Sequence, residues 1–161
     1  MANLIRWLDR HAPARAGVLT YLAMPSEIDP APAVQARPDL RWFVTRTPPR
    51  GGLTIHRYDA PRERHPYGYE QPVADSREVP PDEVDVVICP GLAFDPHGGR
   101  LGRGAGYYDA LLASLRPDAV KVGLTVERRL VPEVPMDEHD APMDWIVTER
   151  RVIEVAGSVP T

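Results

Sequence analysis

Residues 84–91 constrain the fold more than any other segment of this chain. Val84-Asp85-Val86-Val87-Ile88-Cys89 is apolar over almost its whole length and ends at Pro90-Gly91. A short apolar run without regular alternation is typical of a strand that is covered on both faces, as central strands of parallel sheets are. Parallel strands need crossover connections, so the segment predicts helices packed on both sides of a sheet.

The segments on either side show helical and strand patterns in turn. Apolar residues recur at helical spacing over 3–12, and again from Gly106 to the residue before Pro117, which predicts two amphipathic helices. Strand-forming runs predict strands over 17–24, 40–45, 53–58, 120–126 and 145–147. Residues 59–81 are rich in proline, arginine and glutamate without periodicity, and they predict either an exposed flap or lid or a disordered linker.

This order of elements predicts the fold class. Strands that alternate with helices favour parallel pairing, so we expect one α/β domain over residues 1–161, built as a three-layer sandwich with an open, mostly parallel sheet. A chain of 161 residues, of which 43% are hydrophobic, is long enough for one substantial core. Ligands of such sheets bind at the carboxyl ends of the strands, which here are followed by the loops after Met24 and Gly91.

Composition excludes several classes of partner. The formal net charge of -4 and the lack of a long basic cluster argue against nucleic-acid or membrane binding. The N-terminus lacks a signal-peptide pattern, and no run approaches the ~20 apolar residues of a membrane span. The single cysteine, Cys89, lies in the apolar run and predicts a buried thiol rather than a nucleophile. We therefore expect a cytoplasmic monomer that binds small molecules.

Residues 95–109 join the buried strand to the second helix and carry the clearest chemical signal. They hold five glycines together with Arg100 and Arg103. Glycines let backbone N–H groups converge on an anion, the helix start adds partial positive charge, and arginines add charge-assisted hydrogen bonds. Phosphate binding is favoured over a flexible turn, although the loop matches neither the Walker pattern nor the dinucleotide fingerprint. Lys121 is the single lysine, so other phosphate-binding cations are expected to be arginines.

The whole string from Pro90 to Asp109 resembles the signature of the 5-formyltetrahydrofolate cyclo-ligase family. It contains a proline-glycine strand end, an aromatic residue followed by Asp, and then Gly-x-Arg-Leu-Gly-x-Gly-x-Gly-Tyr-Tyr-Asp. Glu27-Ile28 and Tyr67-Gly68-Tyr69 upstream, and Glu138-His139-Asp140 downstream, are similar to the family's pattern in order and approximate spacing. The resemblance covers about residues 17–154.

This resemblance implies an ATP- and magnesium-dependent ligase that closes 5-formyltetrahydrofolate to 5,10-methenyltetrahydrofolate and releases ADP and phosphate. It also implies a Rossmann-like fold similar to the sugar-phosphate isomerase and CoA-transferase type. By matched position, the ATP-binding residues are Arg100, Leu101, Gly102, Arg103, Gly104, Ala105, Gly106, Tyr107 and Tyr108. The residues that bind the reduced folate are Leu22, Glu27, Arg103, Gly104, Ala105, Gly106 and Tyr107. Arg103 and Tyr107 are the expected catalytic residues, and Asp109 and Asp140 are the expected magnesium ligands.

The residues themselves leave plainer roles open. Asp109 is also placed to stabilise a helix N-terminus, and Asp140 belongs to a charged run that water would solvate. Without the resemblance, these two roles are the better interpretation. His97 and His139 lack the paired spacing of a zinc site and are interpreted as loop histidines.

The sequence departs from the family's pattern at three places. The family usually has a helix with a phosphate-binding lysine well before the first strand, whereas no lysine precedes Gly17 here. Gln71 stands where Glu is usual, and Ala105 where Gly or Lys is usual. A start codon upstream of Met1 and a shortened paralogue are both compatible with this, and either predicts that these 161 residues bind ATP more weakly than folate. A non-catalytic folate- or nucleotide-binding paralogue, and a sugar-phosphate or acyl-CoA enzyme, are the alternative functions.

Overall fold

A seven-stranded sheet organises the computed structural model, which describes residues 1–103 and 106–157. Its strand order is β11-β10-β9-β6-β1-β2-β3. The five inner strands pair in parallel, and the two outer pairings, β10 with β11 and β2 with β3, are antiparallel. The strands are β1 (Gly17–Leu19), β2 (Arg41–Arg46), β3 (Thr54–Arg57), β6 (Val86–Cys89), β9 (Val120–Leu124), β10 (Trp145–Val147) and β11 (Val152–Glu154).

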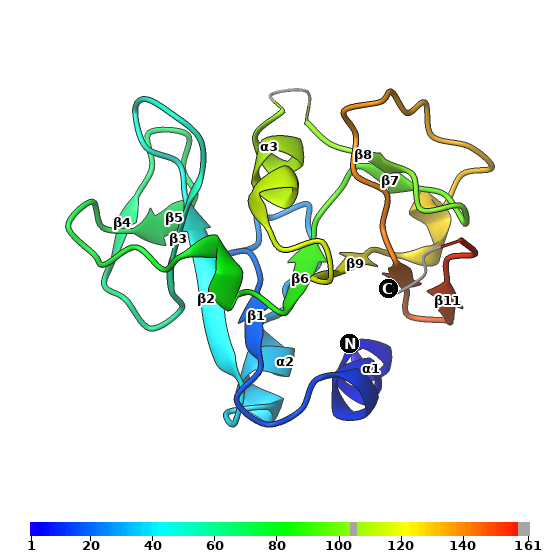
Figure 1. Ribbon diagram of the computed structural model, residues 1–161, viewed down its shortest axis with the longest axis horizontal. Coiled ribbons are helices and arrows are strands. Elements are labelled where there is room, and N and C mark those ends of the chain that lie inside the picture. Colours follow the sequence, from blue (N-terminus) through cyan, green and yellow to red (C-terminus); the bar gives the residue numbers. More distant parts are fainter. Residues whose placement is uncertain (104–105, 158–161) are drawn as a thin grey trace.

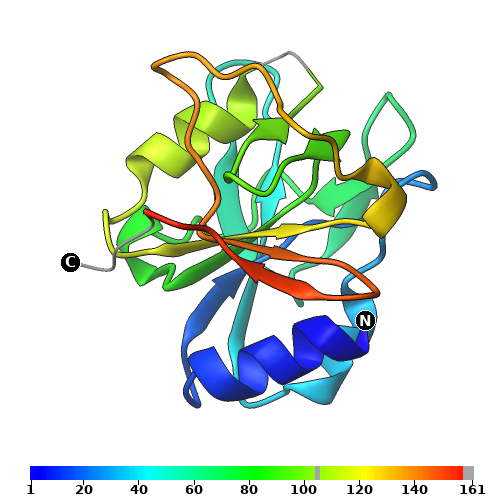
Figure 2. The same cartoon turned by 90° about the vertical axis from the view of Figure 1, so that its right-hand side faces the viewer.

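Helices cover both faces of this sheet. Helices α1 (Ala2–His11) and α2 (Ala31–Ala36) lie on one face, and α3 (Tyr107–Ser114) lies on the other, as Figures 1 and 2 show. The side chains of β6 alternate between the two cores: Val86 and Ile88 pack with α1 and α2, whereas Val87 and Cys89 pack with α3. The predicted three-layer α/β sandwich with a mostly parallel sheet is therefore confirmed, and burial on both faces explains the continuous apolar run.

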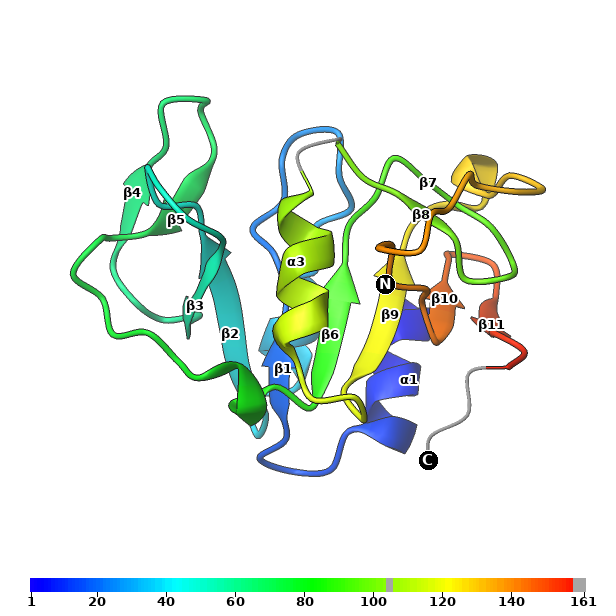
Figure 3. The same ribbon diagram turned by 45° about the horizontal axis from the view of Figure 1, so that its top comes forward.

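The direction of the connections changes between β1 and β6. From β1 the chain continues to β2 on one side, whereas from β6 it continues to β9 on the other side. Loops that leave the carboxyl ends of two such strands diverge and leave a crevice between them, which is where open α/β sheets bind ligands. Figure 3 shows β1 and β6 side by side under α3.

The local differences from the predicted elements have physical causes. Strand β1 ends at Leu19 and not at Met24. Beyond Leu19, the side chains of Tyr21 and Glu27 form hydrogen bonds with the backbone of the following loop, and these bonds replace pairing with a neighbouring strand. Residues 59–81 are not wholly irregular, since they hold the two-stranded hairpin of β4 and β5. The elements without a clear sequence signal are α2, β4 (Arg62–Arg64), β5 (Glu70–Pro72), η1 (Pro81–Glu83), β7 (Ala93–Phe94), β8 (Arg100–Leu101), η2 (Glu127–Arg129) and β11.

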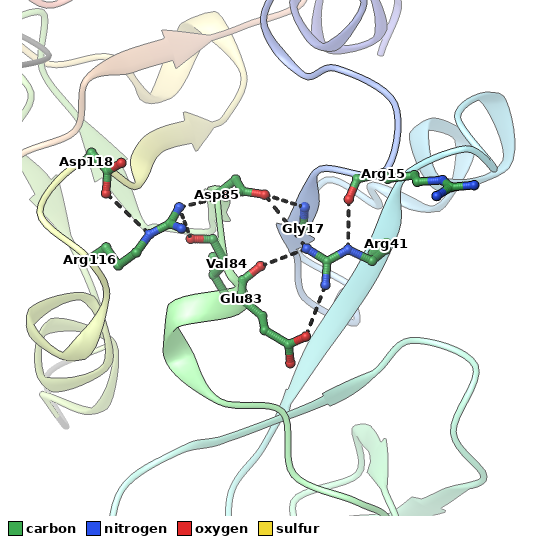
Figure 4. A network of polar contacts seen from close by, with 8 residues as sticks. All are labelled: Arg15, Gly17, Arg41, Glu83, Val84, Asp85, Arg116 and Asp118. Carbon is green, nitrogen blue, oxygen red and sulfur yellow. Dashed lines mark hydrogen bonds and ion pairs between the residues drawn. The ribbon is translucent and has the colours of Figure 1, made fainter.

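A network of hydrogen bonds and ion pairs connects the amino-terminal ends of the central strands, at the end of the sheet opposite the crevice (Figure 4). The Asp85 carboxylate accepts hydrogen bonds from the Gly17 backbone N–H at 2.8 Å and from Arg116 at 2.6 Å. Arg41 donates to the Arg15 carbonyl oxygen at 2.8 Å and pairs with Glu83 at 3.2 Å. The network connects β1, β2 and β6 with the segment after α3, so its role is to hold the sheet's register.

Asp85→Ala is expected to lower the free energy of unfolding by about 1–3 kcal/mol, because the Gly17 N–H loses its acceptor and Arg116 loses a partner. The matched control is Asp118→Ala, which removes a 63% exposed partner of the same Arg116 and is expected to cost less than about 0.5 kcal/mol. Urea titration of both variants measures the difference. Equal losses would contradict a specific role of Asp85.

Within the described ranges 1–103 and 106–157, no helix is both long and apolar enough to cross a membrane.

Candidate functional site

A cavity of about 1130 Å³ occupies the crevice at the carboxyl ends of β1, β2 and β6. Its walls come from the loops after these three strands, the tip of the β4–β5 hairpin, the start of α3 and the segment 135–140. These segments are far apart in the sequence. The cavity therefore lies at the position that the strand order predicts for a ligand.

The predicted site residues that the structure describes all line this one cavity. They are Leu22, Glu27, Arg100, Leu101, Gly102, Arg103, Gly106, Tyr107, Tyr108, Asp109 and Asp140. Gly104 and Ala105 lie outside the described residues. The structure thus brings the two halves of the prediction, the segment after β1 and the glycine loop, to the same hollow; the role of each residue stays a prediction.

Side-chain contacts with the backbone fix the loop after β1. The Tyr21 hydroxyl donates to the Ile28 carbonyl oxygen at 2.6 Å, and Glu27 Oε1 accepts from the Met24 N–H at 2.8 Å. Arg129 donates to the Ser26 carbonyl oxygen at 2.9 Å from the other side. The Glu27 side chain is only 11% exposed, so its carboxylate is held at a set place on the cavity wall.

Arg103 is the cation of the glycine loop that is free to move toward an anion. Its side chain is half exposed, and its guanidinium lies 3.9 Å from Glu27 Oε2 and 3.4 Å from the Ser26 hydroxyl. Both distances are too long for strong hydrogen bonds. A phosphate in the cavity therefore competes with weak partners for Arg103.

Arg100 has a different environment from Arg103. Its side chain is 6% exposed, donates to the Pro90 carbonyl oxygen at 3.1 Å, and lies 3.6 Å from Asp109 and 5.3 Å from the ring centre of Tyr108. These contacts connect the end of β6 to the first turn of α3. Arg100 consequently supplies fixed positive charge and support for the wall, with much less freedom than Arg103.

Asp95 anchors the turn before β8, and sequence reasoning did not assign it a role. Its side chain is buried and accepts three backbone hydrogen bonds, from His97 at 2.8 Å, Gly99 at 2.9 Å and Val134 at 2.6 Å. Burial alone would raise the pKa of this carboxyl, but the three N–H donors outweigh burial and hold the pKa below its ordinary value. Asp95 thereby joins the glycine loop to the segment that carries Asp140. The local signal was an Asp that precedes a Gly-Gly pair, which is typical of an Asx turn.

Three aromatic residues of the β4–β5 hairpin form a wall that the sequence did not predict as part of the site. The rings of His65 and Tyr69 stack with centroids 4.4 Å apart, and the Tyr69 hydroxyl donates to Thr47 at 3.3 Å. Tyr67 is 87% exposed and lines the cavity. Arg46 holds the hairpin against β2 through Glu63 and the Pro72 carbonyl oxygen. The alternation of aromatic residues at 65, 67 and 69 was the available signal.

Two carboxylates of the cavity suit a magnesium ion. Asp109 lies in the first turn of α3, and Asp140 accepts a hydrogen bond from the Asp137 N–H at 3.0 Å. Among the residues that the structure describes, no group of three or more His, Cys, Asp or Glu side chains gathers as a closed metal site. Magnesium usually takes one or two carboxylates and completes its octahedron with phosphate oxygens and water. Both carboxylates line the cavity, which is compatible with that kind of coordination, and their role as magnesium ligands stays a prediction.

Cys89 is buried at the end of β6, and burial raises the pKa of its thiol to about 12. A thiol with that pKa is protonated at neutral pH and is a poor nucleophile. The expectation of a buried cysteine is confirmed.

Comparison with known proteins agrees with this geometry. The model of the 5-formyltetrahydrofolate cyclo-ligase family matches residues 20–149. The 5-formyltetrahydrofolate cyclo-ligase of Escherichia coli K12 is 31% identical over 145 residues, which are 85% of this chain and 80% of that protein. A probable 5-formyltetrahydrofolate cyclo-ligase of Schizosaccharomyces pombe is 38% identical over 54% of this chain, and the match spans about half (49%) of that protein's length.

The fold is also similar to that of a solved structure. The 5,10-methenyltetrahydrofolate synthetase of Aquifex aeolicus superposes with a TM-score of 0.78 and 26% identity, and covers 99% of this chain and 83% of that one.

Proposed function

The chain belongs to the 5-formyltetrahydrofolate cyclo-ligase family, and from this premise we propose that it closes 5-formyltetrahydrofolate to 5,10-methenyltetrahydrofolate at the expense of ATP. The observation that carries the proposal is the convergence of the glycine loop, Glu27 and the Asp109–Asp140 pair on one cavity. A folate and a nucleotide must meet in one site for this reaction. The cavity of about 1130 Å³ is large enough for both ring systems to approach.

The reaction explains why the site has cations and backbone donors but needs no protein nucleophile. The formyl oxygen attacks the γ-phosphorus of ATP, the bond to the β–γ bridging oxygen breaks, and ADP leaves. The neighbouring folate N–H then attacks the formyl carbon and gives up its proton to solvent, and phosphate departs with the former formyl oxygen, which leaves the methenyl bridge. Phosphate is a far better leaving group than hydroxide. Such a transfer depends mainly on alignment and on neutralised charge.

Several residues of the cavity wall have a defined role in this proposal. In this proposal Arg103 turns from Glu27 toward the transferred phosphoryl group, and the start of α3 offers its partial positive charge to the other phosphates. Glu27 accepts hydrogen bonds from the amino and ring N–H groups of the pterin. The exposed ring of Tyr67 offers a stacking surface at the rim.

Asp109 and Asp140 would hold magnesium, which supplies charge neutralisation at the phosphates when it is bound. Asp109→Asn and Asp140→Asn are each expected to raise the magnesium concentration for half-maximal activity by about tenfold, because each removes an anionic ligand and keeps the side-chain size. Magnesium titrations at saturating ATP, with melting curves alongside, measure this. Titrations that match the unmodified chain would identify both groups as structural carboxylates.

The direct test of the proposed function is an absorbance assay for methenyl-folate formation. The purified chain is incubated with 5-formyltetrahydrofolate, with ATP and magnesium each present or withheld. The expected result is product that requires both. Folate binding by calorimetry without any product would instead support a non-catalytic paralogue.

A further inference from the structure

Arg129 joins the loop after β1 to a distant part of the chain. Its guanidinium donates to the Ser26 carbonyl oxygen at 2.9 Å, and the two residues are 103 positions apart in the sequence. Arg129 is partly buried, and the described lining of the cavity does not include it. Leu22, Met24 and Glu27 of the contacted loop do line the cavity. Arg129 therefore acts on the cavity wall without reaching the cavity itself.

Residues 22–28 have few polar contacts with the rest of the chain. Within the loop, the Met24 N–H donates to Glu27 Oε1 at 2.8 Å, and the Glu27 N–H donates to the Met24 carbonyl oxygen at 2.9 Å. Among the described residues, the hydrogen bonds and ion pairs that reach this loop from other segments come from two arginines. The Arg103 contacts, at 3.4 and 3.9 Å, are long. The Arg129 hydrogen bond is therefore the well-formed polar contact that fixes the position of the loop.

The helix η2, which carries Arg129, is itself held in place. The Glu127 carboxylate accepts a hydrogen bond from the Thr148 hydroxyl at 2.7 Å and pairs with Arg151 at 2.7 Å. The Glu127 N–H donates to Glu149 Oε1 at 2.5 Å. Three residues of the β10–β11 turn thus fix η2, so the Arg129 side chain extends from a supported backbone.

The contact between Arg129 and Ser26 connects the two sides of the crevice. Helix η2 follows β9, the loop with Ser26 follows β1, and β6 lies between these two strands in the sheet (Figure 3). The glycine loop belongs to the side of β6 and β9, because it leads from β6 into α3. The hydrogen bond consequently holds the loop that carries Glu27 to the side of the sheet that carries the glycine loop.

We propose that Arg129 is a positioning residue for cyclisation: through the Ser26 carbonyl it holds Glu27 where a folate bound by that carboxylate meets a nucleotide bound by the glycine loop. The inference rests on the proposed function. Reacting atoms must come within about 3–3.5 Å of each other in a defined orientation, and a misplacement of about 1 Å can cost up to about a hundredfold in rate. In this proposal Arg129 touches neither ligand, so its effect comes from the position of the loop.

Arg129→Ala and Arg128→Ala form a matched pair, because Arg128 is an exposed arginine of the same short helix. We expect Arg129→Ala to lower kcat about tenfold and to raise the KM for 5-formyltetrahydrofolate about tenfold, with the KM for ATP within about twofold of the unmodified chain. Its melting temperature should stay close to that of the unmodified chain, since Ser26 is exposed and water can replace the lost donor. Arg129→Lys keeps a cationic donor and should recover most of the lost kcat. Arg128→Ala should change none of these quantities.

Amide hydrogen exchange tests the position of the loop without any substrate. The N–H groups of Met24 and Glu27 are the reporters, because each is hydrogen-bonded inside the loop. Their exchange should be about tenfold faster in Arg129→Ala than in Arg128→Ala. Unchanged exchange, or faster exchange with an unchanged kcat and folate KM, would overturn the inference. If the unmodified chain forms no methenyl product, the proposed function fails, and the exchange comparison still decides whether Arg129 holds this loop.

Discussion

Arg103→Ala is expected to lower kcat/KM for ATP-dependent cyclisation by about 100- to 1000-fold while the melting curve stays that of the unmodified chain. This is the range seen when one charge-stabilising hydrogen-bond donor is removed from an active site. The stability should not change, because the side chain is half exposed and makes only the long contacts to Ser26 and Glu27. Steady-state kinetics with a thermal melt of each variant measure both quantities.

Arg57→Ala is the matched control for this experiment. Arg57 is exposed, pairs with Asp59 at 3.0 Å and lies outside the cavity, so its loss should alter neither turnover nor melting. Arg100→Ala is a less informative variant, since burial against Pro90 and Asp109 makes it a folding defect as well. Near-normal turnover of Arg103→Ala, together with a normal melting curve, would contradict the proposed role of Arg103 in phosphoryl transfer.

The parts of the fold that the sequence predicted are those with a local physical cause. The run 84–89 is apolar because both faces of β6 are covered, and the helical spacing after Gly106 exists because α3 turns one side to the sheet. The gathering of the predicted site residues in one cavity follows largely from the contiguous glycine loop, and the role of each residue stays a prediction. Within this loop, neighbouring residues in the sequence provide both the glycine-rich backbone and the arginine side chains.

The parts that could not be predicted depend on contacts between distant residues. The cavity wall at Tyr67 exists because Arg46 on β2 holds a hairpin that has no strong strand pattern of its own. The early end of β1 depends on where Glu27 turns back to the Met24 N–H. Helix α2 has six residues with Pro32 near its start, which is too short for a periodic signal.

Asp95→Ala is expected to lower the free energy of unfolding by about 3–5 kcal/mol, a loss large enough to unfold a marginal domain. Three backbone N–H groups, of His97, Gly99 and Val134, lose a charged acceptor at once. Water cannot enter easily, because the side chain is almost fully buried and a Cβ on Gly99 would already lie 2.3 Å from Asp95 Oδ2. Chemical denaturation measures the loss, with Asp118→Ala as the exposed-carboxylate control.

Asp95→Asn distinguishes the hydrogen bonds accepted by Oδ1 from the one accepted by Oδ2. The amide oxygen can still accept from His97 and Gly99, as Oδ1 does now, but the amide nitrogen would face the Val134 N–H, where two donors meet. We expect a loss of about 1–3 kcal/mol, together with a weaker magnesium response, because Val134 positions the segment that carries Asp140. A melting curve equal to that of the unmodified chain would contradict the assignment of Val134 to Asp95.

The pH dependence of the same variants gives a test with a defined sign. The pKa of Asp95 is lowered in the folded chain, so its contribution to stability is fully present above the unfolded pKa of about 3.9 and is lost as the pH falls through the lower, folded value. The difference in unfolding free energy between the unmodified chain and Asp95→Asn should therefore be constant from pH 7 to about pH 5 and shrink below about pH 4. A gap that stays the same down to the acid transition would mean that shape, and not the charge on Asp95, holds the glycine loop to the segment after Val134.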